Sequence, residues 1–397
     1  MVKWLNARKQ RNSGMRRLAV AFFSMHIVQL DLDNKKQVDD FLRLPFSIYK
    51  DIPQWVPPMQ MDERLRLSPK RFPFYQHSQA SFFLAYEGMR SIGRLAVLDN
   101  RRYNEYNKTN TAFFYLFECE KNQETAAALF NAAFDWARSR GLENITGPKG
   151  FTPLDGFGLL VKGFEHRPAF GLPYNPAYYI ELIEAQGFVK DGESVSGYLS
   201  ANLQLPPRIH EVANKIAQRR GLRILRCTTR NDLRALVKRL KELYNNSLGG
   251  TAGTVPLTDE EVDTMANQLI WLADPKLVKL VMKDDKAVGF LLAYPDVSVA
   301  LQKTCGRLFL FGWLTFLLEL RRTDWINING AGLLPEYHGS GGTAILYSEM
   351  FKSVSENPRY KHAEVVQIGV ENENMRREME NFGIEFYKLH RMYKKDL

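Results

Sequence analysis

One segment of the chain reads Leu333-Leu334-Pro335-Glu336-Tyr337-His338-Gly339-Ser340-Gly341-Gly342-Thr343, with three glycines in four positions. It separates an apolar run with strand periodicity from an amphipathic run with helix periodicity. Such a turn points successive backbone N–H groups into one concavity, and the following helix adds the positive end of its dipole. We expect an anion such as a pyrophosphate to bind here. For an isolated Gly-x-Gly-Gly, a helix entry with flexible glycines is the alternative.

The sequence on either side of this segment predicts a specific order of elements. Isoleucine and asparagine alternate at period two over residues 325–333, as on a strand. Apolar residues at helical spacing then predict a helix that runs to about residue 354. Further strands are expected at 363–370 and 384–393, with a helix at 372–382 between them. The predicted order is strand, glycine loop, helix, strand, helix, strand.

With this order and motif, the chain resembles the GNAT acyltransferase superfamily, whose hallmark Gln/Arg-x-x-Gly-x-Gly/Ala cradles the pyrophosphate of coenzyme A. Two residues depart from the pattern: His338 replaces the usual Gln or Arg, and Thr343 replaces the last small residue. The resemblance covers about residues 223–397 and is weaker before them. It implies an acyl-CoA cofactor, acetyl-CoA or another, and no metal. The expected binding residues are Leu333, His338, Gly339, Ser340, Gly341, Gly342, Thr343 and Asn374, with Asn372 as a competitor for the last position.

The two halves of the chain repeat one plan. Residues 26–30, a polar turn and a helix are followed by a hairpin at 81–97; residues 222–227, a turn and a helix are followed by a hairpin at 277–293. We therefore predict an α+β fold of two tandem GNAT-like domains, each with a mixed, mostly antiparallel twisted sheet flanked by helices. The expected boundaries are 26–200 for a degenerate domain, 201–221 for a linker helix and 222–397 for the acyl-CoA-binding domain.

The first half lacks the glycine loop. Its corresponding segment, 117–125, has three carboxylates, which suit a helix N-terminus but repel a pyrophosphate. We therefore expect the first half to have a structural or acceptor-binding role. A long loop over 147–179, rich in glycine and aromatic residues, would pack between domains, contact substrate or do both. Asp155 and Tyr174 are its candidate polar groups for substrate binding.

Length and charge limit the other classes of function. A chain of 397 residues suits two domains. The net charge is +10, and six of these charges lie before residue 18, which leaves about +4 and gives no reason to expect a specific nucleic-acid partner. Residues 1–25 are interpreted as a basic extension, disordered or wrongly started. Three scattered cysteines predict a reducing compartment, the cytoplasm.

An apolar run over residues 308–318 is too short to cross a bilayer as a helix. It would lie in a membrane interface with Arg321 and Arg322 among the headgroups, or cover an apolar pocket. We expect a buried or lid helix in preference to membrane contact.

Acyl transfer to an amine requires a donor for the developing oxyanion and a proton acceptor for the amine. The implied fold separates the strand before the glycine loop from the strand at 363–370, so the N–H of Leu333 is the candidate oxyanion donor. Tyr387 would protonate the leaving thiolate, and Glu364 or His338 would act as base. Each also has a plain alternative: a half-buried strand residue, a surface charge and a loop residue, respectively. Asn327 and Asn329 are candidate substrate contacts.

These features predict an N-acyltransferase that moves an acyl group, expected to be acetyl, from coenzyme A to an amine in a ternary complex. The acceptor would be a small molecule or a peptide. Two alternatives stay open. Tandem GNAT-like domains also occur in peptidoglycan aminoacyl ligases, which use aminoacyl-tRNA, and a duplicated scaffold without a clear base would also suit a non-catalytic acyl-CoA sensor.

Overall fold

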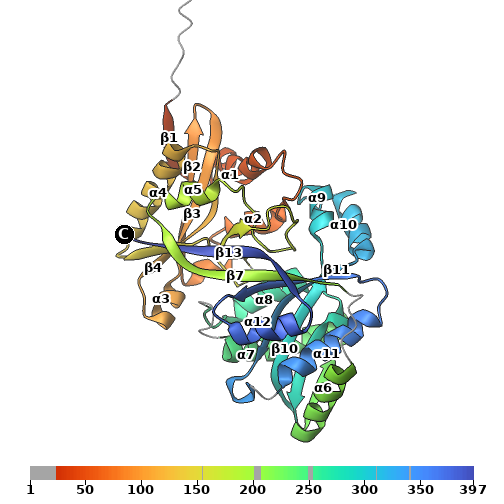
Figure 1. The fold of residues 1–397 in the computed structure, drawn as a ribbon. Helices are drawn as coiled ribbons and strands as arrows, with labels where there is room; N and C mark the ends of the chain where they lie inside the picture. The colour runs from red at the N-terminus through yellow and green to blue at the C-terminus, as the bar shows by residue number, and fades with distance from the viewer. Residues whose placement is uncertain (1–23, 154, 201–206, 249–253, 310, 339–340) are drawn as a thin grey trace, which may run out of the picture.

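A computed structural model describes residues 24–153, 155–200, 207–248, 254–309, 311–338 and 341–397 (Figure 1). Within these ranges, thirteen strands form one mixed sheet flanked by helices. Most neighbouring strands are antiparallel, while β4 and β5 in the first half and β11 and β12 in the second are parallel. The predicted α+β class is therefore confirmed.

The first half contains seven strands. Its elements are β1 (Met25–Gln29), α1 (Lys35–Ile48), α2 (Gln60–Arg66), η1 (Pro73–Gln76), β2 (Gln79–Glu87), β3 (Arg90–Asp99), α3 (Arg101–Asn107), β4 (Thr111–Cys119), α4 (Gln123–Arg138), β5 (Asn144–Gly147), β6 (Leu159–Lys162), α5 (Tyr179–Glu184) and β7 (Val189–Ser200).

The second half repeats much of this order, with added helices and one strand fewer. Its elements are α6 (Pro207–Arg220), β8 (Leu222–Arg226), α7 (Arg230–Leu248), α8 (Asp259–Leu269), η3 (Pro275–Leu277), β9 (Val278–Lys283), β10 (Lys286–Pro295), α9 (Ser298–Thr304), α10 (Phe311–Arg322), β11 (Trp325–Leu333), η4 (Pro335–Tyr337), α11 (Gly342–Ser355), β12 (His362–Gly369), α12 (Glu373–Asn381) and β13 (Glu385–Asp396).

The strand order shows that the two halves exchange their last strands. It runs β1-β2-β3-β4-β5-β13-β7-β12-β11-β10-β9-β8, with β6 also paired to β13. The final strand, β13, therefore lies against β5 of the first half, whereas β7, which ends the first half, lies against β12 of the second. The strands β13 and β7 also pair with each other at the centre (Figure 1). The domain boundaries predicted from the sequence stay a prediction, because the sheet is continuous across them.

Apolar side chains on both faces of the sheet form the cores. In the second half, α11 packs its buried face, including Leu346 and Met350, against Ile326 and Ile328 of β11. The other side chains of β11 alternate onto the opposite face of the sheet, since successive strand residues point to opposite sides. This alternation directs Asn327 and Asn329 away from α11.

One expectation from the sequence was wrong. The apolar run near residue 313 forms α10, which is neither buried nor folded over a pocket: Phe309 and Phe311 are more than 80% exposed, while Phe316, on the inner side of the helix, is fully buried. The helix is amphipathic, so the packing of its inner side alone anchors it to the protein. Within the described ranges, no helix is both long and apolar enough to cross a bilayer.

Candidate active site

The parallel strands β11 and β12 stop pairing midway along their length. They pair from Trp325 with His362 to Ile328 with Val365, and both strands then continue without a mutual ladder to Leu333 and Gly369. Burial changes at the same position: the residues just before the separation are buried, and those just after it are half-buried on both strands. The separation of the two strands that the resemblance implied is therefore present.

Leu333 presents its backbone to this separation. The N–H of Leu334 donates to the carbonyl of Val288 at 2.9 Å, which makes these residues a hydrogen-bonded antiparallel pair. The neighbouring residue, Leu333, therefore points its N–H away from β10 and toward the side that β12 has left. The same alternation directs the N–H of Ala331 to that side, a second candidate donor that the sequence analysis missed. The Nε2 atom of His338 lies 3.0 Å from the carbonyl oxygen of Leu333, so this side chain helps to hold the loop.

The N-terminus of α11 has the features that an anion requires. Gly341 is the N-cap, in the left-handed region at φ 81°, and no described side chain caps the helix. The corresponding helix of the first half, α4, is capped by Asn122, whose side chain accepts from the N–H of Thr125 at 3.0 Å. The first N–H groups of α11 therefore resemble an open anion site, and those of α4 do not. Gly339 and Ser340, also predicted to bind the cofactor, lie outside the described residues.

The described glycines of the loop also have a packing explanation. A Cβ atom on Gly341 would lie 2.6 Å from the side chain of Ile216 on α6, and one on Gly342 would lie 2.8 Å from Leu333. Close packing therefore explains why these two positions are glycine, whether or not a phosphate approaches them. The observation that favours an anion is the uncapped helix end rather than the glycines.

Three predicted residues meet in one pocket of about 700 Å³ on the face of the sheet away from α11. Asn327 and Glu364 are directly paired on β11 and β12, one residue before the strands separate, and Tyr387 reaches the same pocket from β13. We call this the polar pocket. Its lining is Glu165, His166, Arg167, Pro168, Ala169, Tyr198, Asp296, Trp325, Asn327, His362, Glu364, Glu385 and Tyr387.

The interpretation of Glu364 as a surface charge was wrong. Its side chain is 2% exposed and lies 2.7 Å from Nζ of Lys388, which is 1% exposed. Burial raises the pKa of Glu364, while the charge of Lys388 and hydrogen bonds from Lys388 and Tyr387 oppose this. Burial lowers the pKa of Lys388, and Glu364 opposes that shift. The two groups form a coupled buried pair, and Lys388 also donates to the hydroxyl of Tyr387 at 3.1 Å.

Asp296, at the end of β10, connects the polar pocket to the long loop of the first half. Its carboxylate accepts from the N–H of Phe170 at 3.0 Å and from Nδ2 of Asn327 at 3.1 Å. Arg167 lies 3.6 Å from the other carboxylate oxygen. The Oδ1 atom of Asn327 is buried and has no hydrogen-bond partner among the described residues. An acceptor atom in that state, at a pocket wall, suits a donor N–H from a ligand.

The structure does not bring all the predicted catalytic groups together. Leu333 is six residues beyond Asn327 on β11, which is roughly 20 Å at about 3.3 Å per strand residue. Glu364 pairs with Asn327, so it cannot act directly on a carbonyl held by the N–H of Leu333. Ala331, two residues closer, is the better candidate donor, but by the same rise it lies roughly 13 Å from Asn327 and is also beyond direct contact with Glu364. His338 lies at the Leu333 end and is likewise remote from the polar pocket.

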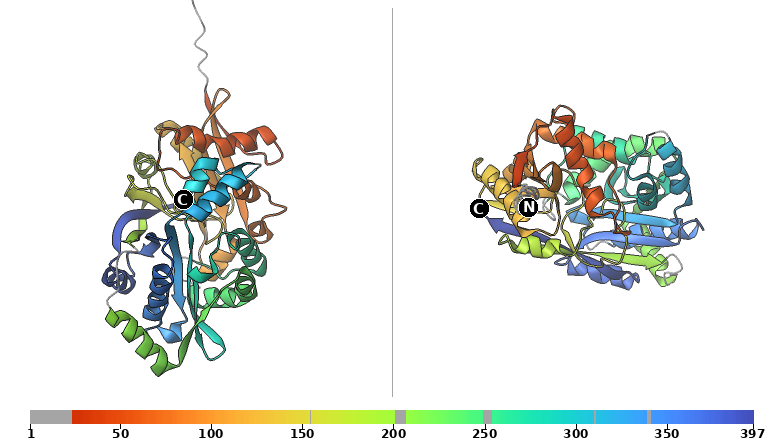
Figure 2. Two further views of the ribbon diagram at one scale, coloured as in Figure 1. Left: turned by 90° about the vertical axis from the view of Figure 1, so that its right-hand side faces the viewer. Right: turned by 90° about the horizontal axis from the view of Figure 1, so that it is seen from above.

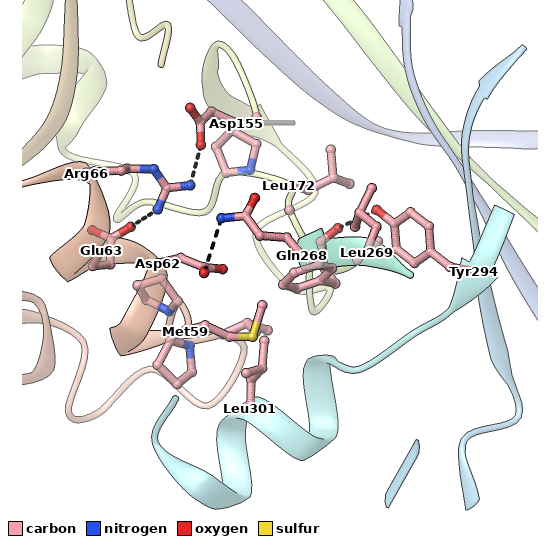
Figure 3. Close-up of a pocket in the computed structure, with 18 of the residues that line it drawn as sticks. Met59, Asp62, Glu63, Arg66, Asp155, Leu172, Gln268, Leu269, Tyr294 and Leu301 are labelled. Carbon is pink, nitrogen blue, oxygen red and sulfur yellow. Dashed lines mark hydrogen bonds and ion pairs between the residues drawn. The ribbon is translucent and has the colours of Figure 1, made fainter. Parts of the chain in front are cut away.

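A second cavity, of about 180 Å³, lies between the halves on the same face (Figure 3). At one end, Asp155 and Glu63 form ion pairs with Arg66, and Asp62 accepts from Gln268 at 3.3 Å. The other end is apolar. We call it the amphipathic cavity; its apolar lining is Val56, Pro57, Pro58, Met59, Ala169, Phe170, Leu172, Pro173, Leu269 and Leu301.

The other residues predicted to bind substrate differ in their relation to the two pockets. Asn329 donates to the hydroxyl of Tyr294, which lines the amphipathic cavity, so Asn329 contributes to that wall indirectly. Asp155 lines the cavity directly. Tyr174 lines neither pocket. Its hydroxyl instead donates to the carbonyl of Phe164 at 2.8 Å. The long loop 147–179 therefore both packs between the halves and contributes to two pockets, the combination that the sequence left open.

The two asparagines that competed for the cofactor differ in their contacts. The side chain of Asn372 accepts from the N–H of Met375 at 3.2 Å and caps α12, whereas Asn374 is exposed on the first turn. Only the side chain of Asn372 is therefore committed to the fold. No group of three His, Cys, Asp or Glu side chains suited to a metal occurs in the described ranges.

The comparisons agree with this architecture. The chain has the fold of a tandem GNAT protein, as the glycine motif predicted. Over 94% of its length and 98% of the other chain, it matches a tandem GNAT protein of the clavulanic acid biosynthesis pathway, with a TM-score of 0.55 and 13% identity. At that identity, the match establishes the fold alone.

Two curated relatives match over nearly their whole length. One is protein YghO of Escherichia coli K12, 26% identical over 371 residues, with 92% of this chain and 94% of the relative covered. The other is named bacterial ceramide synthase, from Caulobacter vibrioides, 28% identical over 369 residues, with coverage of 90% and 94%. No protein-family model matches the chain.

Proposed function

We propose that this protein is an acyl-CoA-dependent N-acyltransferase whose acceptor is a long-chain amine. The observation that carries the proposal is the position of Asn327 and Glu364, paired beside the point where β11 and β12 separate, with Tyr387 in the same pocket. The relative named ceramide synthase supports a fatty acyl group in place of the acetyl group expected from the sequence, because a ceramide is an amide of a fatty acid and a long-chain amino alcohol.

The donor would bind along the separated strands. The uncapped N–H groups at Gly342 and Thr343 suit its pyrophosphate, and the backbone of Leu333 and Ala331 would hydrogen-bond to its arm. Bound acyl-CoA supplies the thioester that the amine attacks. One aligned oxyanion donor, for which Ala331 is our candidate, is worth roughly 3 to 4 kcal/mol of barrier. Because Ala331 lies roughly 13 Å along the strand from the residue paired with Glu364, proton transfer between the two would run through water.

The amine would enter the polar pocket. Four carboxylates line that pocket, those of Glu165, Asp296, Glu364 and Glu385. Arg167 lies near Asp296 and Lys388 pairs with Glu364, which leaves a smaller net negative charge. This excess of negative charge attracts an ammonium group. The unpartnered Oδ1 of Asn327 can then accept an N–H of the amine and hold it beside Glu364.

Glu364 is the best candidate base. Burial raises the pKa of Glu364 above its ordinary value, which makes the carboxylate a stronger base, and the charge of Lys388 opposes that rise. Tyr387 would donate a hydrogen bond to the sulfur of the departing thiolate, and the thiolate would take up its proton from water. Burial raises the pKa of Tyr387 well above its ordinary value, so the hydroxyl is protonated and available as a donor.

The test supplies acetyl-CoA and a long-chain acyl-CoA, each with a long-chain amino alcohol, a lysine peptide or no acceptor. We expect free coenzyme A thiol and an amide of the corresponding mass with the long-chain pair, and a rate at least a hundredfold lower in Glu364→Gln. Stabilisation by acyl-CoA without any new mass would instead indicate a sensor. Binding of tRNA with a steep salt dependence would indicate the aminoacyl-tRNA alternative.

A further inference from the structure

The outer face of α10 is an apolar surface that no described residue covers. Phe311, Leu314 and Leu318 follow one another at helical spacing, and Leu317 lies beside them; all are exposed. Phe309, just before the helix, is exposed as well. Figure 1 and Figure 2 show α9 and α10 together at the periphery of the molecule, away from the sheet.

The inner face of α10 is firmly anchored, so the helix is not poised to fold over the protein. Phe316 is fully buried in a cluster with Leu301 of α9 and Met59 before α2. Glu319 pairs with Lys303 of α9 at 2.8 Å. Beyond the helix, Arg359 donates to the carbonyl of Thr323 at 2.9 Å. Turning the apolar face inward would break this packing.

Cations surround the apolar face. Arg321 and Arg322 lie at the C-terminal end of α10, and Arg307 lies before its start; all three are exposed. Between residues 298 and 322 there are four basic residues and one acidic residue. Trp313, at the edge of the exposed face, stacks on Phe316 with its ring half outside. An aromatic edge, exposed leucines and flanking arginines are the composition of a helix that lies in a membrane interface.

We propose that α10, with the α9–α10 turn, docks this protein onto the surface of an anionic lipid bilayer. The helix lies in the plane of the interface with Phe311, Leu314 and Leu318 inserted. A two-fold contact with a second copy is disfavoured, because it would gather the arginines of both copies at one interface, where the one acidic residue of the segment, Glu319, already pairs with Lys303 and Arg322. The charge pattern fits a negatively charged surface better than a second copy of itself.

The position of α10 also places lipid close to the amphipathic cavity. Met59 and Leu301, which pack beneath the helix, line the apolar end of that cavity (Figure 3). A docked molecule would therefore hold the cavity near the bilayer. The docking proposal itself stands on the exposed face and its charges, and does not depend on the transferase activity.

Flotation of the full chain with vesicles tests the proposal. One set contains phosphatidylcholine alone, and the other an equimolar mixture with phosphatidylglycerol. We expect binding to the anionic set, a loss of at least tenfold in L314Q/L318Q, and in R321Q/R322Q a loss of the preference for anionic vesicles. Met89, which is 82% exposed in the β2–β3 turn, provides the matched control M89Q, which should bind as wild type.

Three results would overturn the proposal: no flotation of the wild type, equal flotation of L314Q/L318Q, or a dimer in gel filtration that L314Q/L318Q alone disrupts. The last would assign the face to a second copy. If the double variant does not fold, brominated lipid decides instead. It should quench wild-type fluorescence more than that of Trp313→Phe, and equal quenching would refute docking through α10.

Discussion

Lys388 on β13 lies 2.7 Å from Glu364 on β12, although β7 runs between the two strands. The last strand of the chain therefore supplies the counter-charge for the candidate base. The side chain of Lys388 reaches over β7 to Glu364 from β13, the strand that also pairs with β5 of the first half. The chemistry assigned to the second half thus depends on the strand exchange between the halves.

Removing the cation should cost stability. In Lys388→Met, Glu364 would remain buried without its partner, which typically costs about 3 to 5 kcal/mol. The double variant E364Q/K388M leaves neither charge and should recover much of that loss. Urea unfolding of both variants measures this, and equal stability of K388M and wild type would show that the pair contributes nothing to the fold.

The same pair predicts a pH dependence of activity. If Glu364 is the base, kcat/KM rises as pH passes through its pKa, which burial raises. The cation of Lys388 opposes that rise, so Lys388→Met should raise the pKa further and move the acidic limb of the profile to higher pH. Glu364→Gln should remove the limb. A limb at the same pH in Glu364→Gln would assign the titration to another group.

Substitution of Thr343 tests the anion site without destabilising the fold. It is the second residue of α11, where a carboxylate favours the helix but repels a pyrophosphate. Thr343→Asp should keep or slightly raise the melting temperature and weaken acyl-CoA binding at least tenfold by calorimetry. Thr343→Asn matches it in size without the charge and should bind nearly as wild type. Equal affinity in both variants would place the phosphates elsewhere.

Strand periodicity predicted where part of the polar pocket lies, while the roles of its residues stay predictions. The alternation over 325–333 correctly directed Asn327 to one face of β11, and the predicted Tyr387 and Glu364 share its pocket. Lys388, Asp296 and Arg167 were missed, because three segments distant in sequence bring them together. Alternation specifies which face a side chain occupies but not which strand lies beside it. For this reason the sequence pattern did not predict the exchange of β7 and β13 between the halves.

Because of Glu261 on α8, the free energy of unfolding should decrease at acidic pH. Its carboxylate contacts His77 at 3.0 Å and Arg102 at 3.2 Å, both from the first half. Burial alone would raise the pKa of Glu261, but hydrogen bonds from His77 and Thr258 and the charge of Arg102 lower it overall. A lowered pKa stabilises the fold above the ordinary value of 4.5, and this stability is lost as pH falls through the folded pKa.

Urea unfolding between about pH 3 and 6 measures this contribution. Glu261→Gln should unfold more easily near neutral pH, by roughly 1 to 3 kcal/mol for the buried donors left unpaired, and should lose less stability than wild type on acidification. Glu105→Gln removes an exposed carboxylate of the first half and is the matched control. Parallel acid curves for wild type and Glu261→Gln would locate the acid sensitivity in other carboxylates.

The strand exchange predicts that neither half folds alone. A fragment of residues 24–206 lacks β13, which pairs with β5 and β6 and places Tyr393 in the first-half core. A fragment of residues 207–397 lacks β7, the partner of β12. Since each would expose unpaired strand edges and part of a core, we expect both to aggregate alone and to form a one-to-one complex when co-expressed. A second-half fragment that is monomeric and unfolds cooperatively would show that β7 is dispensable there.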